Sequence, residues 1–153
     1  MAPTSASAAQ QIAAFVAKFS PAVAREIRAA RSRLRRLFPT AVELVYDNYN
    51  FLVFGFCASE RASDCIVSLA CSAKGVALSF YHGSSLADPH DLLQGSGSQN
   101  RFLRLDSPAT LHDPEVLALV RAAVEQAKTP LPANSRGYTI IKSVSAKQRP
   151  RRV

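Results

Sequence analysis

Residues 65–82 read CIVSLACSAKGVALSFYH, two apolar runs joined by a short loop. Apolar side chains recur at every second position of the first run, at Cys65, Val67, Leu69 and Cys71. The second run, 76–82, alternates in the same way, and a period of two is typical of strands that bury one face. The loop places Gly75 where a tight turn favours a positive φ. The stretch therefore predicts an antiparallel hairpin with one face packed by helices.

Further segments on both sides of this hairpin have the Val, Ile, Phe and Tyr content of strands. They are residues 42–48, 51–56 and 101–105, with 138–144 as a possible sixth or edge strand. Between them, 88–94 follows Asp88-Pro89 and precedes Gly95, which predicts one or two helical turns.

Three segments have helical periodicity. Residues 9–19 carry apolar side chains at three- and four-residue steps, and Ser20-Pro21 then begins a second helix that ends before Pro39. Asp113-Pro114 begins the third, which extends to about residue 128. The predicted fold class is α+β: a single antiparallel or mixed sheet of about five strands, packed by N-terminal helices and a C-terminal helix.

The 153 residues suit one domain. We expect a disordered N-terminus at 1–8, a single α+β domain at 9–128, and a linker, possible edge strand and basic tail at 129–153. The last residues, KQRPRRV, have too much charge and an interrupting proline for a core segment. No apolar run approaches the ~20 residues of a membrane span, and the start lacks the order of a secretory signal. We expect a cytoplasmic protein with no membrane partner; the alternative is that 1–38, with Glu26 as its single acid, is an organelle transit segment.

The three cysteines, Cys57, Cys65 and Cys71, have no CxxC spacing, which indicates buried reduced thiols rather than a disulfide framework or a zinc site. The three histidines lack ligand pairing. The sequence predicts no metal and no cofactor.

The formal charge of +8 is unevenly distributed. Residues 18–36 and 136–152 each carry +6, which leaves −4 for the remainder. The asymmetry predicts either an anionic partner such as nucleic acid or a solvated helix face with a loose tail. The candidate anion or nucleic-acid face comprises Arg25, Arg28, Arg31, Arg35, Lys147, Arg149, Arg151 and Arg152.

Polar and glycine-rich segments near the strand ends suggest a second kind of site. The candidate ligand-binding residues are Tyr46, Tyr49, Asn50, His82, Gly95, Gly97 and Arg101. The 95–100 loop, GSGSQN, lacks the third glycine and the following helix of a dinucleotide motif, so it indicates a flexible turn or a small anion pocket. No GxSxG elbow is present, and nothing indicates an enzyme.

Six stretches, taken in their order, resemble the YdhG-like family, a domain-of-unknown-function family of small bacterial proteins. They are 46–50 (YDNYN), 55–63 (GFCASERAS), 80–83 (FYHG), 93–97 (LQGSG), 101–105 (RFLRL) and 140–152 (IIKSVSAKQRPRR). The resemblance implies a compact α+β fold with an antiparallel sheet covered by N- and C-terminal helices. Some members are described as frataxin-like iron chaperones, and no residue of this chain is assigned to iron.

The sequence thus favours a non-enzymatic ligand-binding or adaptor domain with an unknown small ligand or protein partner. The alternatives are a nucleic-acid-associated basic protein, with weak phosphate contacts through the basic face, and a frataxin-like iron-delivery protein.

Overall fold

A computed structural model describes residues 7–153, so the disorder expected at 1–8 falls outside the described residues except at its last two positions. Helix α1 (Ala8–Ala17) begins there. Ser7 accepts a hydrogen bond from the backbone of Gln10, whose side chain accepts one from the Ser7 backbone. This reciprocal pair satisfies two donors that the first helical turn leaves free. Ser7 and Ala8 therefore belong to an ordered helix start.

The centre of the molecule is one six-stranded mixed sheet. Its strands are β1 (Val42–Asp47), β2 (Leu52–Cys57), β3 (Cys65–Ser72), β4 (Gly75–Phe80), β5 (Arg101–Arg104) and β6 (Tyr138–Val144). The spatial order is β5-β4-β3-β2-β1-β6, and every neighbouring pair is antiparallel except β1 with β6. The predicted 65–82 hairpin is confirmed, with Gly75 at a φ of +132° directly opposite Ser72.

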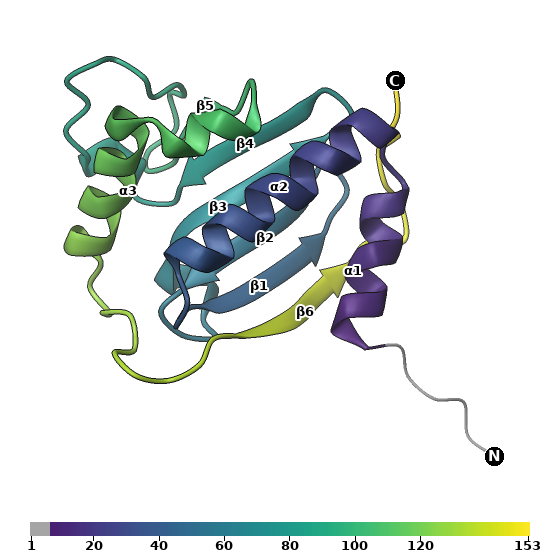
Figure 1. Ribbon diagram of the computed structural model, residues 1–153, viewed down its shortest axis with the longest axis horizontal. Coiled ribbons are helices and arrows are strands. Elements are labelled where there is room, and N and C mark those ends of the chain that lie inside the picture. The colour runs from purple at the N-terminus through teal and green to yellow at the C-terminus, as the bar shows by residue number, and fades with distance from the viewer. Residues whose placement is uncertain (1–6) are drawn as a thin grey trace.

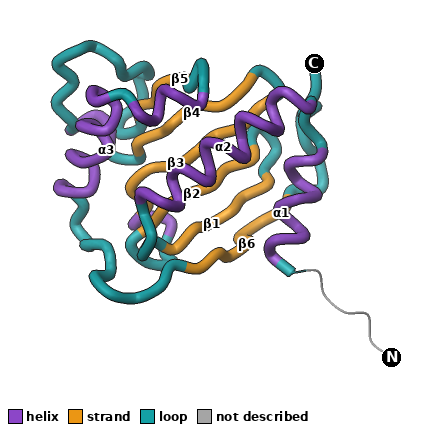
Figure 2. The backbone as a smooth tube through the Cα atoms, viewed as in Figure 1, coloured by secondary structure: helices purple, strands orange, loops and turns teal. Residues whose placement is uncertain are grey.

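Helices α1, α2 (Pro21–Leu37) and α3 (Pro114–Gln126) all lie on one face of this sheet (Figures 1 and 2). Under them, one row of apolar side chains crosses every strand: Ile141, Val45, Phe54, Leu69, Leu78 and Leu103. Ile27 and Leu34 of α2 are fully buried against the same core. The predicted α+β class and the helix-covered face are confirmed.

The other face of the sheet carries small side chains over β3 and β4. Ser68 lies opposite Ser79, and Ala70 lies opposite Ala77. Toward β1 the same face has a small cluster of Val42, Leu44 and Cys57 with three half-buried neighbours. None of the helices that the structure describes covers this side.

The prediction of helical turns at 88–94 is wrong. Both carboxylate oxygens of Asp88 accept backbone hydrogen bonds, from Leu92 and Leu93, and Asp91 has a φ of 53°. Gln94 exchanges two backbone hydrogen bonds with Phe102 of β5, at 2.7 and 3.0 Å. This pairing requires extended backbone, and the Asp88 side chain caps a turn rather than a helix.

The expectation that KQRPRRV lies outside the core is wrong for Arg151, which is 5% exposed. Its guanidinium donates to the fully buried Asp47 carboxylate at 3.0 Å and to the backbone carbonyls of Asn48 and Tyr49. Lys18 donates to the other Asp47 oxygen at 2.7 Å. The tail is therefore held against the β1–β2 turn and the end of α1. A buried carboxylate requires hydrogen-bonding partners, and Lys18 and Arg151 supply them to Asp47.

Within residues 7–153, no helix combines the length and the hydropathy that crossing a bilayer requires.

Candidate functional site

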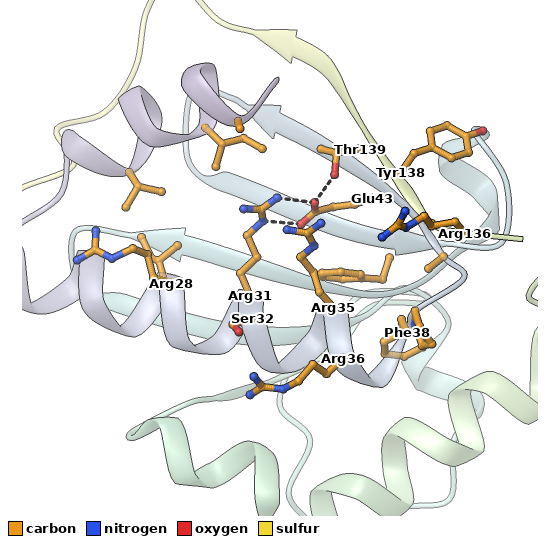
Figure 3. Close-up of a pocket in the computed structure, with 18 of the residues that line it drawn as sticks. Arg28, Arg31, Ser32, Arg35, Arg36, Phe38, Glu43, Arg136, Tyr138 and Thr139 are labelled. Atoms are coloured by element: carbon orange, nitrogen blue, oxygen red, sulfur yellow. Dashed lines mark hydrogen bonds and ion pairs between the residues drawn. The ribbon is translucent and has the colours of Figure 1, made fainter. Parts of the chain in front are cut away.

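A groove of about 690 Å³ lies between α1 and α2. Its lower part is formed by β1 and β6, and its closed end by the segments 38–41 and 136–138. Five arginines line it: Arg28, Arg31, Arg35, Arg36 and Arg136 (Figure 3). We call this concavity the arginine groove.

Helical periodicity places most of these arginines. Arg28, Arg31 and Arg35 follow one another at steps of three and four residues, so they share one side of α2, next to the buried stripe of Ile27 and Leu34. With a rise of about 1.5 Å per residue, Arg28 and Arg35 are separated by roughly 10 Å along the helix axis. The alternation of apolar and basic residues that packs α2 on the sheet therefore also builds one wall of the groove.

The floor holds a carboxylate that is already neutralised. Glu43 on β1 is 3% exposed, and both of its oxygens accept hydrogen bonds from Arg31, each at 2.8 Å. Thr139, directly opposite on β6, donates a third at 2.8 Å. The Arg31 guanidinium also lies 5.3 Å from the centre of the Phe54 ring. This bidentate pair fixes Arg31 in place.

The closed end depends on a glycine. The Gly137 N–H donates to the Pro39 carbonyl at 3.0 Å, and a Cβ at this position would overlap the Ala41 carbonyl oxygen. Only glycine allows this close approach of two backbones. It positions Arg136 at the groove. Tyr138, on the other side of Gly137, lies opposite Val42, so its side chain is on the other face of the sheet, where its hydroxyl donates to Glu60 at 2.8 Å.

The charges of the groove do not cancel. Glu43 is the one acid in the lining, against five guanidinium groups, which leaves a formal charge of +4. Of the ion pairs within residues 7–153, only that of Arg31 involves a groove arginine. Figure 3 shows Arg31, Arg35 and Arg136 extending toward Glu43, whereas Arg28 and Arg36 extend away from it. The groove therefore has unneutralised positive charge on a rigid frame.

No protein-family model, curated protein or solved structure matches this chain. We therefore identify the candidate site from its geometry and charge alone.

The predicted basic face is divided by the structure. Arg28, Arg31 and Arg35 line the groove, and Arg25 is exposed on α2. Of the tail residues, Lys147 and Arg149 are exposed, with Arg149 5.8 Å from the Tyr49 ring centre. Arg152 donates to the carbonyls of Ala17 and Lys18 at the end of α1, and Arg151 is buried. The Arg151 guanidinium is thus occupied within the fold, because Asp47 and two carbonyls hold it.

The predicted ligand-binding residues are not brought together. Tyr46, Tyr49 and Asn50 lie at the β1–β2 turn, beside the C-terminal tail, whereas His82 and the 95–101 segment lie beside α3 (Figure 1). β1 has six residues, so its two ends are roughly 17 Å apart. In a meander of antiparallel strands successive turns alternate between the two ends of the sheet, so spacing along the chain did not reveal this separation.

The 95–101 segment is held by its own hydrogen bonds. Arg101 donates to the carbonyls of Gly97 and Asn100, at 2.6 and 2.8 Å, and Ser84 donates to that of Ser98 at 3.1 Å. Gly95 has a φ of +117°, and a Cβ on Gly83 would lie 2.6 Å from that of Arg101. The Arg101 guanidinium closes the loop, so its donors serve carbonyl groups of the chain itself.

His82 lies in a smaller concavity of about 380 Å³, lined also by Asp64, Cys65, Gln126 and Thr129. Asp64 in its lining accepts hydrogen bonds from Ser59 at 2.6 Å and from Thr129 at 3.0 Å, and hydrogen bonding to Ser59 contributes most to holding the pKa of Asp64 below its usual value.

The three cysteines are free thiols. Cys57 and Cys65 lie opposite each other on β2 and β3, and hydrogen bonding to Cys65, together with burial, raises the pKa of the Cys57 thiol. Burial raises the pKa of Cys71 as well. Within residues 7–153 no three His, Cys, Asp or Glu side chains gather as a metal site would require.

Sequence reasoning missed Glu43, Arg136 and Gly137. One signal was available: Gly137 stands between a cation and an aromatic residue directly before a strand, where a close backbone approach is a common reason for glycine.

Proposed function

We propose that this protein is a non-enzymatic binding domain that holds an anionic ligand in the arginine groove. The observation that carries the proposal is the convergence of Arg35 from α2 and Arg136 from the segment before β6 on one concavity. Among the residues that the structure describes, neither has a carboxylate partner. Guanidinium groups remain charged at any physiological pH and present planar donors suited to phosphate and carboxylate.

The groove has the properties of a preformed site. Its volume lies in the usual range for small-ligand pockets of 300–1,000 Å³. Arg31 is fixed by Glu43, and the remaining like charges repel one another, a cost that a bound anion relieves. Both oxygens of Glu43 accept hydrogen bonds from Arg31 and Thr139, so this carboxylate holds the groove wall and floor together. These features favour a site that binds an anion.

The test uses inorganic pyrophosphate as the probe, measured by isothermal titration calorimetry at low salt. A charge-assisted hydrogen bond contributes about 1.5–3 kcal/mol, so Arg35→Gln and Arg136→Gln should each weaken binding by roughly tenfold or more. Arg121→Gln, an exposed position on α3 outside the groove, makes the same change in net charge and should alter affinity less than twofold. Equal affinities for the unmodified protein and the Arg35→Gln/Arg136→Gln double variant would refute the proposal.

Nucleic acid is the alternative partner, through phosphate contacts on the outer side of α2. Arg25 is exposed there and is not part of the groove lining. Fluorescence anisotropy with labelled single-stranded and duplex oligonucleotides separates the two ideas. Binding that is weakened by Arg25→Gln but retained with Arg35→Gln/Arg136→Gln would assign the function to the outer surface and remove the groove from it.

A further inference from the structure

We infer that the ligand of the arginine groove is a phosphate monoester with an apolar or aromatic organic group. The inference rests on the proposed function and goes further, because it identifies which kind of anion the groove fits and where each part of it lies.

The charge at the closed end matches a dianion. Arg31, Arg35 and Arg136 converge there around Glu43, and three guanidinium groups with one carboxylate leave a formal charge of +2. A phosphate monoester carries a charge close to −2 above its second pKa of about 6. A carboxylate or a sulfonate carries one negative charge and would leave this end half neutralised.

Hydrogen-bond donors are available at the same place. Both oxygens of Glu43 already accept hydrogen bonds from Arg31 and Thr139, and within residues 7–153 neither Arg35 nor Arg136 forms an ion pair, so both keep their donors for a ligand. Each planar guanidinium group can donate two parallel hydrogen bonds, so the two together can satisfy the three terminal oxygens of a monoester.

Beyond this end the groove has one apolar wall, and it is too large for phosphate alone. Its α1 wall consists of Ala9, Ile12, Ala13 and Val16, and Phe38 closes the end. No acidic or basic residue of α1 contributes to this wall. An organic group attached to the phosphate would cover this apolar wall, and burial of apolar surface favours binding.

The experiment compares three probes by calorimetry at pH 7.5: inorganic phosphate, phenyl phosphate and benzenesulfonate. We expect phenyl phosphate to bind at least tenfold more tightly than either of the others. Because the monoester loses a charge as pH falls through about 6, its affinity should decrease at least threefold between pH 7.5 and 5.5, whereas that of benzenesulfonate should stay within twofold.

Variants test separately where the phosphate and the organic group of the ligand bind. Arg35→Gln should weaken phosphate and phenyl phosphate by the same factor of ten or more. Ala13→Asn, which places an amide on the apolar α1 wall, should weaken phenyl phosphate at least fivefold and leave phosphate within twofold. Ala14→Asn, exposed on α1 outside the groove lining, should retain the unmodified affinity. Far-UV circular dichroism of each variant verifies that it is folded.

The outcomes separate this inference from the proposed function. If phosphate and pyrophosphate bind through Arg35 and Arg136 but phenyl phosphate binds no more tightly than phosphate, the inference is overturned and the proposed function stands. The inference is overturned also if Ala13→Asn weakens phosphate and phenyl phosphate equally. If no anion binds the unmodified protein, both are overturned.

Discussion

At the scale of single residues, Asp47 is a fully buried carboxylate with two cationic partners. Lys18 lies 2.7 Å away from one of its oxygens, and Arg151 lies 3.0 Å away from the other. Burial alone would raise the pKa of this carboxyl, but hydrogen bonds from Lys18 and Arg151 outweigh burial, and the pKa lies below its ordinary value. A lowered folded-state pKa contributes stability that is complete above the unfolded pKa.

This residue predicts how stability responds to acid. The free energy of unfolding should stay level above pH 5 and decrease as the pH falls through the unfolded aspartate pKa of about 3.9 toward the lower folded value. Urea unfolding at pH 7, 5, 4 and 3 measures it. Asp47→Asn should be less stable at pH 7 and should show a shallower acid dependence, while the exposed Asp106→Asn should follow the unmodified protein. Identical acid dependence in all three proteins would contradict this role for Asp47.

At the scale of elements, the entry into β6 depends on Gly137, whose backbone lies against Pro39 and Ala41. The pairing of β6 with β1 begins one residue later, at Tyr138 opposite Val42. The position of this segment therefore affects both the sheet edge and the placement of Arg136.

Gly137→Ala should force the two backbones apart, because the new methyl group overlaps the Ala41 carbonyl oxygen. We expect a loss of about 1–3 kcal/mol, as for overpacked sites, and a pyrophosphate affinity reduced at least fivefold through displacement of Arg136. Gly97→Ala is the matched control, since a Cβ there has no neighbour within 4 Å. Equal stability and affinity of the two alanine variants would show that the close approach has no importance.

The elements also show how far sequence reasoning extends. The 65–82 hairpin and α2 were predictable because local periodicity determines which side chains are buried. The 88–94 turn was not, because its conformation depends on pairing of Gln94 with Phe102. The parallel pairing of β6 with β1 joins residues nearly a hundred positions apart, and no local pattern identifies such a partner. The α2 arginines, which form one wall of the groove, could be predicted from the sequence. Arg136 could not, because only the pairing of β6 with β1 brings it near α2.

At the scale of the whole molecule, the tail and the sheet form one unit. Arg151 connects the β1–β2 turn with the tail, and Arg152 connects the tail with the end of α1. Breaking a buried charge pair costs about 3–5 kcal/mol, which is a large part of the stability of an ordinary domain.

Arg151→Met should therefore destabilise the whole protein and not only its tail. We expect thermal unfolding at a lower temperature but still in a single transition, with far-UV circular dichroism and tyrosine fluorescence giving the same midpoint. Arg149→Met, which removes an exposed cation beside the Tyr49 ring, should change the midpoint little. A tyrosine transition that separates from the circular dichroism transition would show that the tail opens by itself.

The fastening of Arg151 to Asp47 also affects biosynthesis. The two residues are 104 positions apart, so when Asp47 leaves the ribosome its buried partner has not yet been made. Lys18 is already available to donate to one carboxylate oxygen of Asp47, but Arg151, the donor to the other oxygen, has not been synthesised. A nascent chain lacking residue 151 thus has a core carboxylate that is only half satisfied. We expect it to stay open to chaperones and proteases until the tail emerges, which makes completion of the tail the step that commits the chain to its native state.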